Sequence, residues 1–157
     1  MAIHFFEEET TLKLNNSRKV KLWLKELAMA HGYKLGNLNY IFCSDNYLYQ
    51  INIQYLNHHT HTDIITFDQS DQPGIIEGDI YVSIDRIKEN AKEWETSFEK
   101  ELFRVISHGL LHLCGFSDKS EIDKAEMRNQ ENLALEKLKS QLNQATVPRG
   151  TVEGNKK

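Results

Sequence analysis

Two histidines, His108 and His112, lie four residues apart in the C-terminal half of the chain. If this segment is helical, both imidazoles project from one face about one turn apart and can bind one metal ion. A catalytic zinc site also needs a third protein ligand and a position left open for water. Gly115 can end such a helix in the left-handed conformation, so that the chain folds back and brings the Asp118 carboxylate to the histidines. The spacing therefore predicts a site for one divalent metal ion, for which we expect zinc, at His108, His112 and Asp118.

An alternative interpretation leaves the metal out. His108 and His112 would then be hydrogen-bonded core histidines, and Asp118 a turn residue that faces solvent. Three features favour the metal: the surrounding helix is apolar, where two imidazoles without partners are costly; a helix-ending glycine follows; and a carboxylate comes three residues later. Cys114 could also approach a metal, but Asp118 is the better third ligand.

Gly109 argues against one class of hydrolase. In zinc peptidases with the H-E-x-x-H motif, the residue after the first histidine is a glutamate that acts as general base. Gly109 occupies that position here and has no side chain. A metallopeptidase-like hydrolase therefore remains only an alternative function.

The segment from His108 to Gly115 reads H-G-x-x-H-L-x-G and resembles the signature of the YbeY endoribonuclease family, the bacterial rRNA maturation factors. Further blocks shared with such proteins occur in the same order at 56–57, 62–67, 78–80 and 101–102, and the resemblance extends to about Leu138. It implies a small mixed sheet with surrounding helices, one zinc ion per chain, and metal-dependent cleavage of single-stranded RNA. It also implies roles in maturation of the 16S rRNA 3′ end and in ribosome quality control, with rRNA and ribosomal particles or assembly proteins as partners. A non-catalytic ribosome-assembly factor with structural zinc is a second alternative.

The chain departs from the family at two places. The third zinc ligand is usually a histidine, whereas this chain has Asp118, whose negative charge should make the metal-bound water less acidic. The family segment between Leu-Asn and Thr-Asp is usually longer and carries an arginine important for function. This chain has only His58-His59-Thr60-His61 there, and no arginine matches.

No general base is assigned beyond the metal-bound water, but several side chains are candidates. His58, His59 and His61 could contact phosphate or transfer a proton near neutral pH, or they could belong to a solvated loop. Asp63 and Asp79 could serve as acid or base, although their positions at strand starts fit backbone hydrogen bonding at least as well. His59 and Asp63 are the catalytic candidates that we carry forward.

The elements that must position these residues follow from hydrophobic spacing and capping signals. Asn16 or Ser17 can cap the first helix, Ser44 can cap the second, and Pro73-Gly74 predicts the turn of an antiparallel hairpin. The order of elements predicts a single α+β domain with an about four-stranded mixed sheet, surrounding helices and a buried metal-binding helix. We expect strands at 2–7, 38–43, 63–68 and 78–83, and helices at 18–31, 44–55, 83–94, 98–114 and 122–142.

One metal-dependent endoribonuclease-like domain should span residues 1–142. Residues 143–157 show no hydrophobic periodicity, which predicts a disordered C-terminal tail. Met127 follows the histidine segment and is expected to pack in the core. Cys43 and Cys114 lie far apart and are expected to be buried thiols, because a disulfide is unusual in a reducing compartment.

Composition limits the cellular setting and the partners. The apolar stretches are far shorter than the roughly 20 residues of a membrane span, and the first residues lack the features of a signal peptide, so we expect a cytoplasmic protein. The net charge of −4 argues against coating nucleic acid through non-specific electrostatics, so RNA would need a local basic patch. Arg18, Lys21 and Lys25 could form a phosphate-facing stripe, or simply a solvated helix face.

Overall fold

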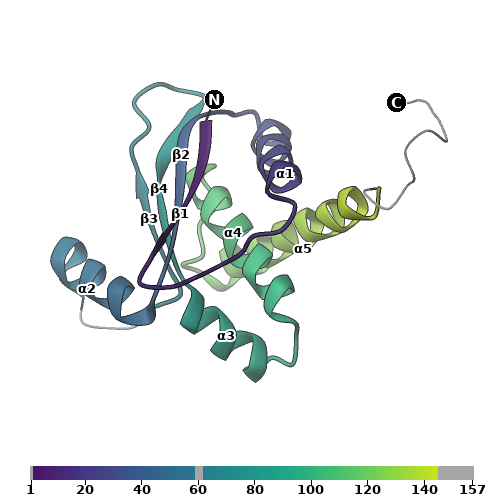
Figure 1. The fold of residues 1–157 in the computed structure, drawn as a ribbon. Coiled ribbons are helices and arrows are strands. Elements are labelled where there is room, and N and C mark those ends of the chain that lie inside the picture. The colour runs from purple at the N-terminus through teal and green to yellow at the C-terminus, as the bar shows by residue number, and fades with distance from the viewer. Residues whose placement is uncertain (1, 59–61, 145–157) are drawn as a thin grey trace.

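The computed structural model describes residues 2–58 and 62–144, and these form a four-stranded mixed sheet with five helices (Figure 1). This confirms the predicted single α+β fold. The strands are β1 (Ala2–Glu8), β2 (Lys34–Cys43), β3 (Ile64–Asp68) and β4 (Ile75–Ser83). The helices are α1 (Ser17–Ala30), α2 (Asp45–Leu56), α3 (Ile84–Glu93), α4 (Phe98–Leu113) and α5 (Glu121–Gln144).

The strands are arranged in the order β1-β2-β4-β3. β2 pairs in parallel with both β1 and β4, whereas β3 pairs antiparallel with β4, which confirms the predicted hairpin. β2 begins four residues earlier than its predicted start at Leu38, at Lys34. A shift in the pairing register between Leu35 and Leu38 interrupts the alternation of this strand, which is why its first part could not be recognised from the sequence.

The two faces of the sheet have different coverings. α1, α4 and α5 lie on one side and enclose the main hydrophobic core, while α2 packs on the other side over a smaller cluster (Figure 1). α4 is buried along most of its length, as predicted for the central helix. The main core includes Trp23, Tyr40, Ile80, Ile106 and Leu110.

Four of the helices follow a serine whose hydroxyl accepts a hydrogen bond from a backbone N–H in the first turn: Ser44, Ser83, Ser97 and Ser120. The cap predicted at Ser44 is therefore confirmed. The side-chain cap predicted for α1 is wrong, because Asn16 adopts a left-handed conformation with a φ of 59° and its side chain makes no capping bond.

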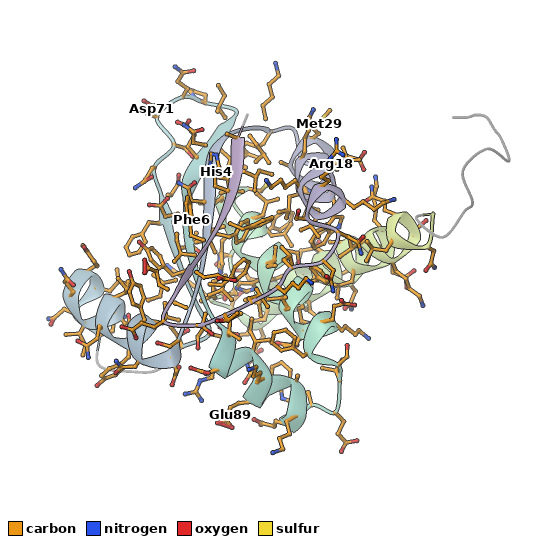
Figure 2. All side chains as sticks on the ribbon, viewed as in Figure 1. His4, Phe6, Arg18, Met29, Asp71 and Glu89 are labelled. Atoms are coloured by element: carbon orange, nitrogen blue, oxygen red, sulfur yellow. The ribbon has the colours of Figure 1, made fainter. Side chains whose placement is uncertain are left out.

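Several smaller expectations can be compared with the structure. Met127, Cys43 and Cys114 are buried, and both cysteines are free thiols. α5 continues to Gln144, two residues past the predicted domain boundary, and residues 145–157 of the expected tail lie outside the described residues. None of the helices described is long and apolar enough to cross a membrane. His4 and Phe6 lie on the edge strand β1 with exposed side chains (Figure 2).

Candidate metal centre

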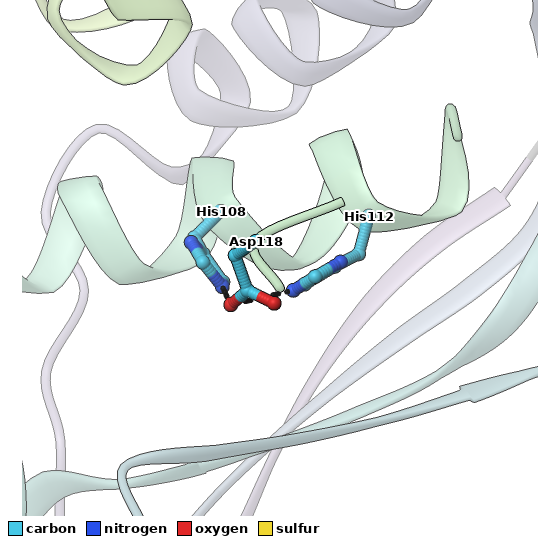
Figure 3. A group of neighbouring side chains, drawn as sticks. All are labelled: His108, His112 and Asp118. Atoms are coloured by element: carbon cyan, nitrogen blue, oxygen red, sulfur yellow. Dashed lines mark ion pairs between the residues drawn. The ribbon is translucent and has the colours of Figure 1, made fainter. Parts of the chain in front are cut away.

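The side chains of His108, His112 and Asp118 converge at the C-terminal end of α4 (Figure 3). The Asp118 Oδ2 atom lies 3.4 Å from the Nε2 of His108 and 3.3 Å from the Nε2 of His112. One ligand atom from each of the three residues lies within 4.8 Å of the other two. The structure therefore brings together the three residues that the spacing predicted.

The turn after α4 carries Asp118 back to the histidines. Gly115 adopts a φ of +101°, which strains a residue with a side chain. The backbone N–H of Phe116 donates to the carbonyl of Leu111 over 3.0 Å, and that of Gly115 donates to the carbonyl of His112 over 3.0 Å. These two bonds are the pair that defines the Schellman motif of helix ends. The predicted role of Gly115 as helix terminator is confirmed.

Both imidazoles are oriented by a hydrogen bond at Nδ1. His108 Nδ1 lies 2.7 Å from the Glu131 carboxylate, and His112 Nδ1 lies 3.0 Å from the carbonyl of Phe116. Both partner oxygens are acceptors, so each Nδ1 carries the proton that it donates. In the neutral ring, this leaves the Nε2 lone pair directed toward Asp118. Two lone pairs and a carboxylate therefore face one another.

This donor set fits a tetrahedral metal ion such as zinc. Metal–nitrogen and metal–oxygen bonds of about 2.0–2.2 Å place two ligand atoms roughly 3.3–3.6 Å apart in a tetrahedral shell. The distances from Asp118 to the two histidines lie at this separation. A carboxylate together with two imidazole nitrogens is also a ligand combination that zinc accepts. Of the residues that the structure describes, this is the one group of at least three such side chains close enough for a metal.

A buried ion-pair network contacts the Nδ1 atom of His108. Glu131 of α5 is almost fully buried, and its second carboxylate oxygen lies 3.1 Å from the guanidinium of Arg104 on α4. Burial by itself lowers the pKa of His108, but the hydrogen bond and charge of Glu131, followed by Asp118, raise it above its usual value. Arg104 compensates the charge of Glu131, which allows a carboxylate to be buried next to the ring.

The three side chains form part of the wall of a cleft of about 830 Å³. The Asp118 side chain remains 43% exposed, and those of His108 and His112 remain 20% and 28% exposed. A metal held there would be accessible from the cleft. The cleft is also lined by residues of α2, β3, α5 and the end of α3, including Asn52, Thr66, Trp94, Lys124 and Arg128.

Of the predicted acid–base residues, Asp63 lies at this cleft and Asp79 does not. Asp63 lines it with His108, and burial raises the pKa of its carboxyl, although the charge of His108 opposes the shift. Asp79 lies on the face of β4 opposite to Ile80, which packs against α4, and accepts a hydrogen bond from Asn39. Asp79 is therefore away from the site.

Of the three loop histidines, His58 belongs to the described residues. His58 is exposed and lines the cleft, which is compatible with a role in substrate contact. His59, a predicted catalytic candidate, and His61 lie outside the described residues.

The structure does not place the predicted basic stripe at the cleft. Arg18, Lys21 and Lys25 belong to α1, and none of the three lines the cleft (Figure 2 labels Arg18). The arginine and lysine residues in the lining are Arg104, Lys124 and Arg128.

Sequence reasoning missed these cations and Glu131, although two signals were present. Arg104 precedes His108 by four residues, so on a helix it must share its face. Glu131 interrupts the apolar stripe of α5 formed by Met127, Ala134 and Leu138. A single acidic residue at a buried position usually has a specific partner.

Comparison with known proteins gives consistent matches along the chain. Residues 3–139 match the family described as Endoribonuclease YbeY. A protein of that name from Cytophaga hutchinsonii is 47% identical over 133 residues, covering 85% of this chain and 93% of the relative. Another from Flavobacterium johnsoniae is 46% identical over 127 residues, covering 81% and 91%. A solution structure of a protein from Thermotoga maritima shares the fold with a TM-score of 0.62 at 24% identity, covering 99% of this chain and all of that one.

Proposed function

Because this chain belongs to the endoribonuclease YbeY family, we propose that it is a zinc-dependent endoribonuclease that cleaves rRNA. We place its action in maturation of the 16S rRNA 3′ end and in ribosome quality control, in the cytoplasm. Its partners would be rRNA and ribosomal particles or assembly proteins. Family membership supports the nuclease class, and the geometry of the site supports the metal dependence.

The observation that carries the proposal is the convergence of two oriented imidazoles and a carboxylate at an open cleft. His108, His112 and Asp118 would hold the zinc ion. When bound, zinc supplies Lewis acidity toward a phosphate oxygen and increases the acidity of water. Glu131 and the Phe116 carbonyl keep the imidazoles in the tautomer and orientation that binding requires.

Asp63 is our candidate for proton transfer beside the scissile phosphate. Its carboxylate accepts a hydrogen bond from the Asn90 amide over 3.4 Å, which restrains it. A raised pKa brings a carboxyl group closer to the pH at which it exchanges protons efficiently. His59 remains a second candidate from the sequence.

The structure gives a physical argument against the metallopeptidase alternative. A Cβ added at Gly109 would meet Ile80 at 2.9 Å and Ile64 at 3.0 Å, so this position packs tightly against the sheet. A glutamate there could not act as a base next to the histidines without displacing the sheet.

The remaining alternative is an assembly factor with structural zinc. Structural zinc sites are closed by four protein ligands, whereas catalytic sites keep a position open. Here three ligands lie at the wall of a cleft, and the carboxylate among them is 43% exposed. This arrangement favours catalysis.

Cleavage of rRNA fragments tests the proposal. Zinc-loaded wild-type protein should cleave fragments that contain the 3′ end of 16S rRNA, and His112→Ala should lose this activity. His4→Ala is the matched control, because His4 lies exposed on β1, away from the cleft. Equal cleavage by wild type and His112→Ala would show a contaminating nuclease and remove the basis for the enzyme. Zinc bound in stoichiometric amount without any cleavage would favour the structural role.

A further inference from the structure

An exposed tryptophan lines the same cleft as the three candidate metal ligands. Trp94 is the C-cap residue of α3, and 52% of its surface is accessible. Large aromatic side chains are usually buried, so one that lines a cleft in an exposed state offers a surface for a ligand. Aromatic side chains of this kind are the platforms on which proteins stack the bases of single-stranded nucleic acids.

A cation lies directly against this tryptophan. The guanidinium carbon of Arg128, on α5, is 5.8 Å from the centre of the Trp94 ring. Lys124 lies one helical turn before Arg128 and also lines the cleft. Arg128 is 54% exposed, and Lys124 is exposed and forms no ion pair within the described part of the chain. Both charged groups are therefore exposed, so that a phosphate can reach them.

Arg128 is connected to the candidate metal centre through the carboxylate of Glu131. Arg128 Nε lies 4.0 Å from one oxygen of Glu131, and the other oxygen of Glu131 lies 2.7 Å from His108 Nδ1. Arg104, the third arginine or lysine of the cleft, is almost buried and already neutralised by Glu131. The exposed arginine and lysine side chains of the cleft are thus Arg128, which lies over Trp94, and Lys124, one helical turn away.

From these contacts we infer that Trp94, Arg128 and Lys124 form a subsite for one nucleotide of a single-stranded RNA. The base stacks on the Trp94 indole, and Arg128 and Lys124 bind the adjoining phosphate. The inference rests on the proposed endoribonuclease function. It adds to that function the position of the RNA strand outside the metal centre. If the only role of Arg128 were to pack against Trp94, the tryptophan would not need to keep half of its surface exposed.

The two tryptophans of the chain make a direct test possible. Trp23 is 1% exposed and donates its indole N–H to the carbonyl of Ala134, so its fluorescence should not respond to a ligand in the cleft. Stopped-flow mixing of zinc-loaded protein with a short oligoadenylate should quench the emission of wild type before cleavage begins. In Trp94→Phe, where only Trp23 emits, the quench should disappear.

Measurements of binding affinity distinguish the contribution of base stacking from that of the positive charges. Trp94→Ala should weaken binding of the oligoadenylate roughly 5- to 150-fold, whereas Trp94→Phe, which keeps an aromatic face, should stay within about threefold of wild type. Arg128→Gln should reduce the slope of log affinity against log salt by about 0.7. An oligomer with the same backbone but abasic sites should bind wild type and Trp94→Ala equally.

Phe6→Ala is the matched control, because Phe6 is a similarly exposed aromatic residue on β1, 49% accessible and outside the cleft. If Trp94→Ala binds RNA like Phe6→Ala while wild type cleaves RNA, the stacking subsite is wrong and the proposed function stands. If zinc-loaded wild type neither binds nor cleaves any of the RNAs, the proposed function fails and the subsite fails with it.

Discussion

The Nδ1 atom of His108 lies 2.7 Å from a carboxylate oxygen of Glu131, although the two residues belong to different helices. The contact joins the C-terminal half of α4 to the buried face of α5, which is otherwise apolar. Glu131 is in turn held by Arg104, which comes from the same face of α4 as His108. The orientation of one candidate ligand therefore depends on a residue 23 positions further along the chain.

Substitution of Glu131 should weaken zinc binding without removing any ligand. Partners that orient a metal-binding histidine typically contribute about 10- to 100-fold in metal affinity. We expect a loss of about tenfold for Glu131→Gln, whose amide oxygen can still accept from Nδ1, and nearer 100-fold for Glu131→Ala. Zinc competition with a chromophoric chelator measures both. Glu126→Gln, at an exposed position of α5, is the control; an unchanged affinity in Glu131→Ala would show that the contact has no orienting role.

Removal of the carboxylate at Asp118 should abolish tight zinc binding. Asp118→Ala leaves two imidazoles and should lose about one equivalent of metal, whereas Asp118→His supplies another side chain that zinc accepts as a ligand. Zinc should raise the midpoint of thermal unfolding for wild type and Asp118→His, because a ligand that binds only the folded state stabilises it. The same shift in Asp118→Ala would mean that Asp118 is not a ligand.

A side chain at Gly109 should destabilise the fold. A Cβ there would lie 2.9 Å from Ile80 Cγ2 in a fully buried contact between α4 and the sheet. Overpacking of this kind costs about 1–3 kcal/mol, which over most of this range exceeds the gain of about 1 kcal/mol from the better helix propensity of alanine. Urea unfolding of Gly109→Ala measures the net loss. In an Ile80→Ala background the contacts at 2.9 Å and 3.1 Å are removed and only that with Ile64 remains, so the penalty should shrink. An identical penalty in both backgrounds would place the strain elsewhere.

The residues of the candidate centre could be found from the sequence because they are local. His108, His112 and Gly115 belong to one helix and its end, where spacing alone determines which side chains share a face. Their proximity to Asp118 therefore followed from the helix period and the conformation of one glycine. Their role as metal ligands remains a prediction.

Features that depend on tertiary contacts could not be found in this way. Trp94 and Arg128 meet only because α3 and α5 both lie against α4, and nothing in their own segments indicates the contact. The start of β2 was missed for a related reason, because Glu77 of the neighbouring strand accepts from the backbone of Asn37 at the register shift. The prediction of a side-chain cap at Asn16 was wrong because the backbone of this residue adopts a left-handed conformation and its side chain makes no capping bond.

Asp63 should make stability depend on pH. Burial raises the pKa of its carboxyl in the folded state above the value of about 3.9 for an unfolded chain. The folded state therefore retains the proton longer, and the stability that Asp63 contributes below the unfolded pKa is lost as pH rises through the folded pKa. Asp63→Asn does not lose a proton, so in metal-free protein it should be more stable than wild type at neutral pH.

The advantage of Asp63→Asn should fade below about pH 4, where both states of wild type are protonated. Urea unfolding at a series of pH values measures this difference. Asp68→Asn is the matched control, because Asp68 lies on the same hairpin but is exposed. A difference between Asp63→Asn and wild type that stays constant over the whole pH range would rule out an ionisation effect.

The Schellman turn at Gly115 has a consequence for assembly of the site. Because the turn reverses the chain directly after α4, all three candidate ligands come from residues 108–118, and bringing them together closes only a very short loop. The entropy cost of loop closure grows with the logarithm of loop length, and contacts at such small sequence separation form quickly during folding. Contacts among the candidate ligands therefore have low contact order. β2 and β4, which belong to the sheet that α4 packs against, must instead pair across more than thirty intervening residues.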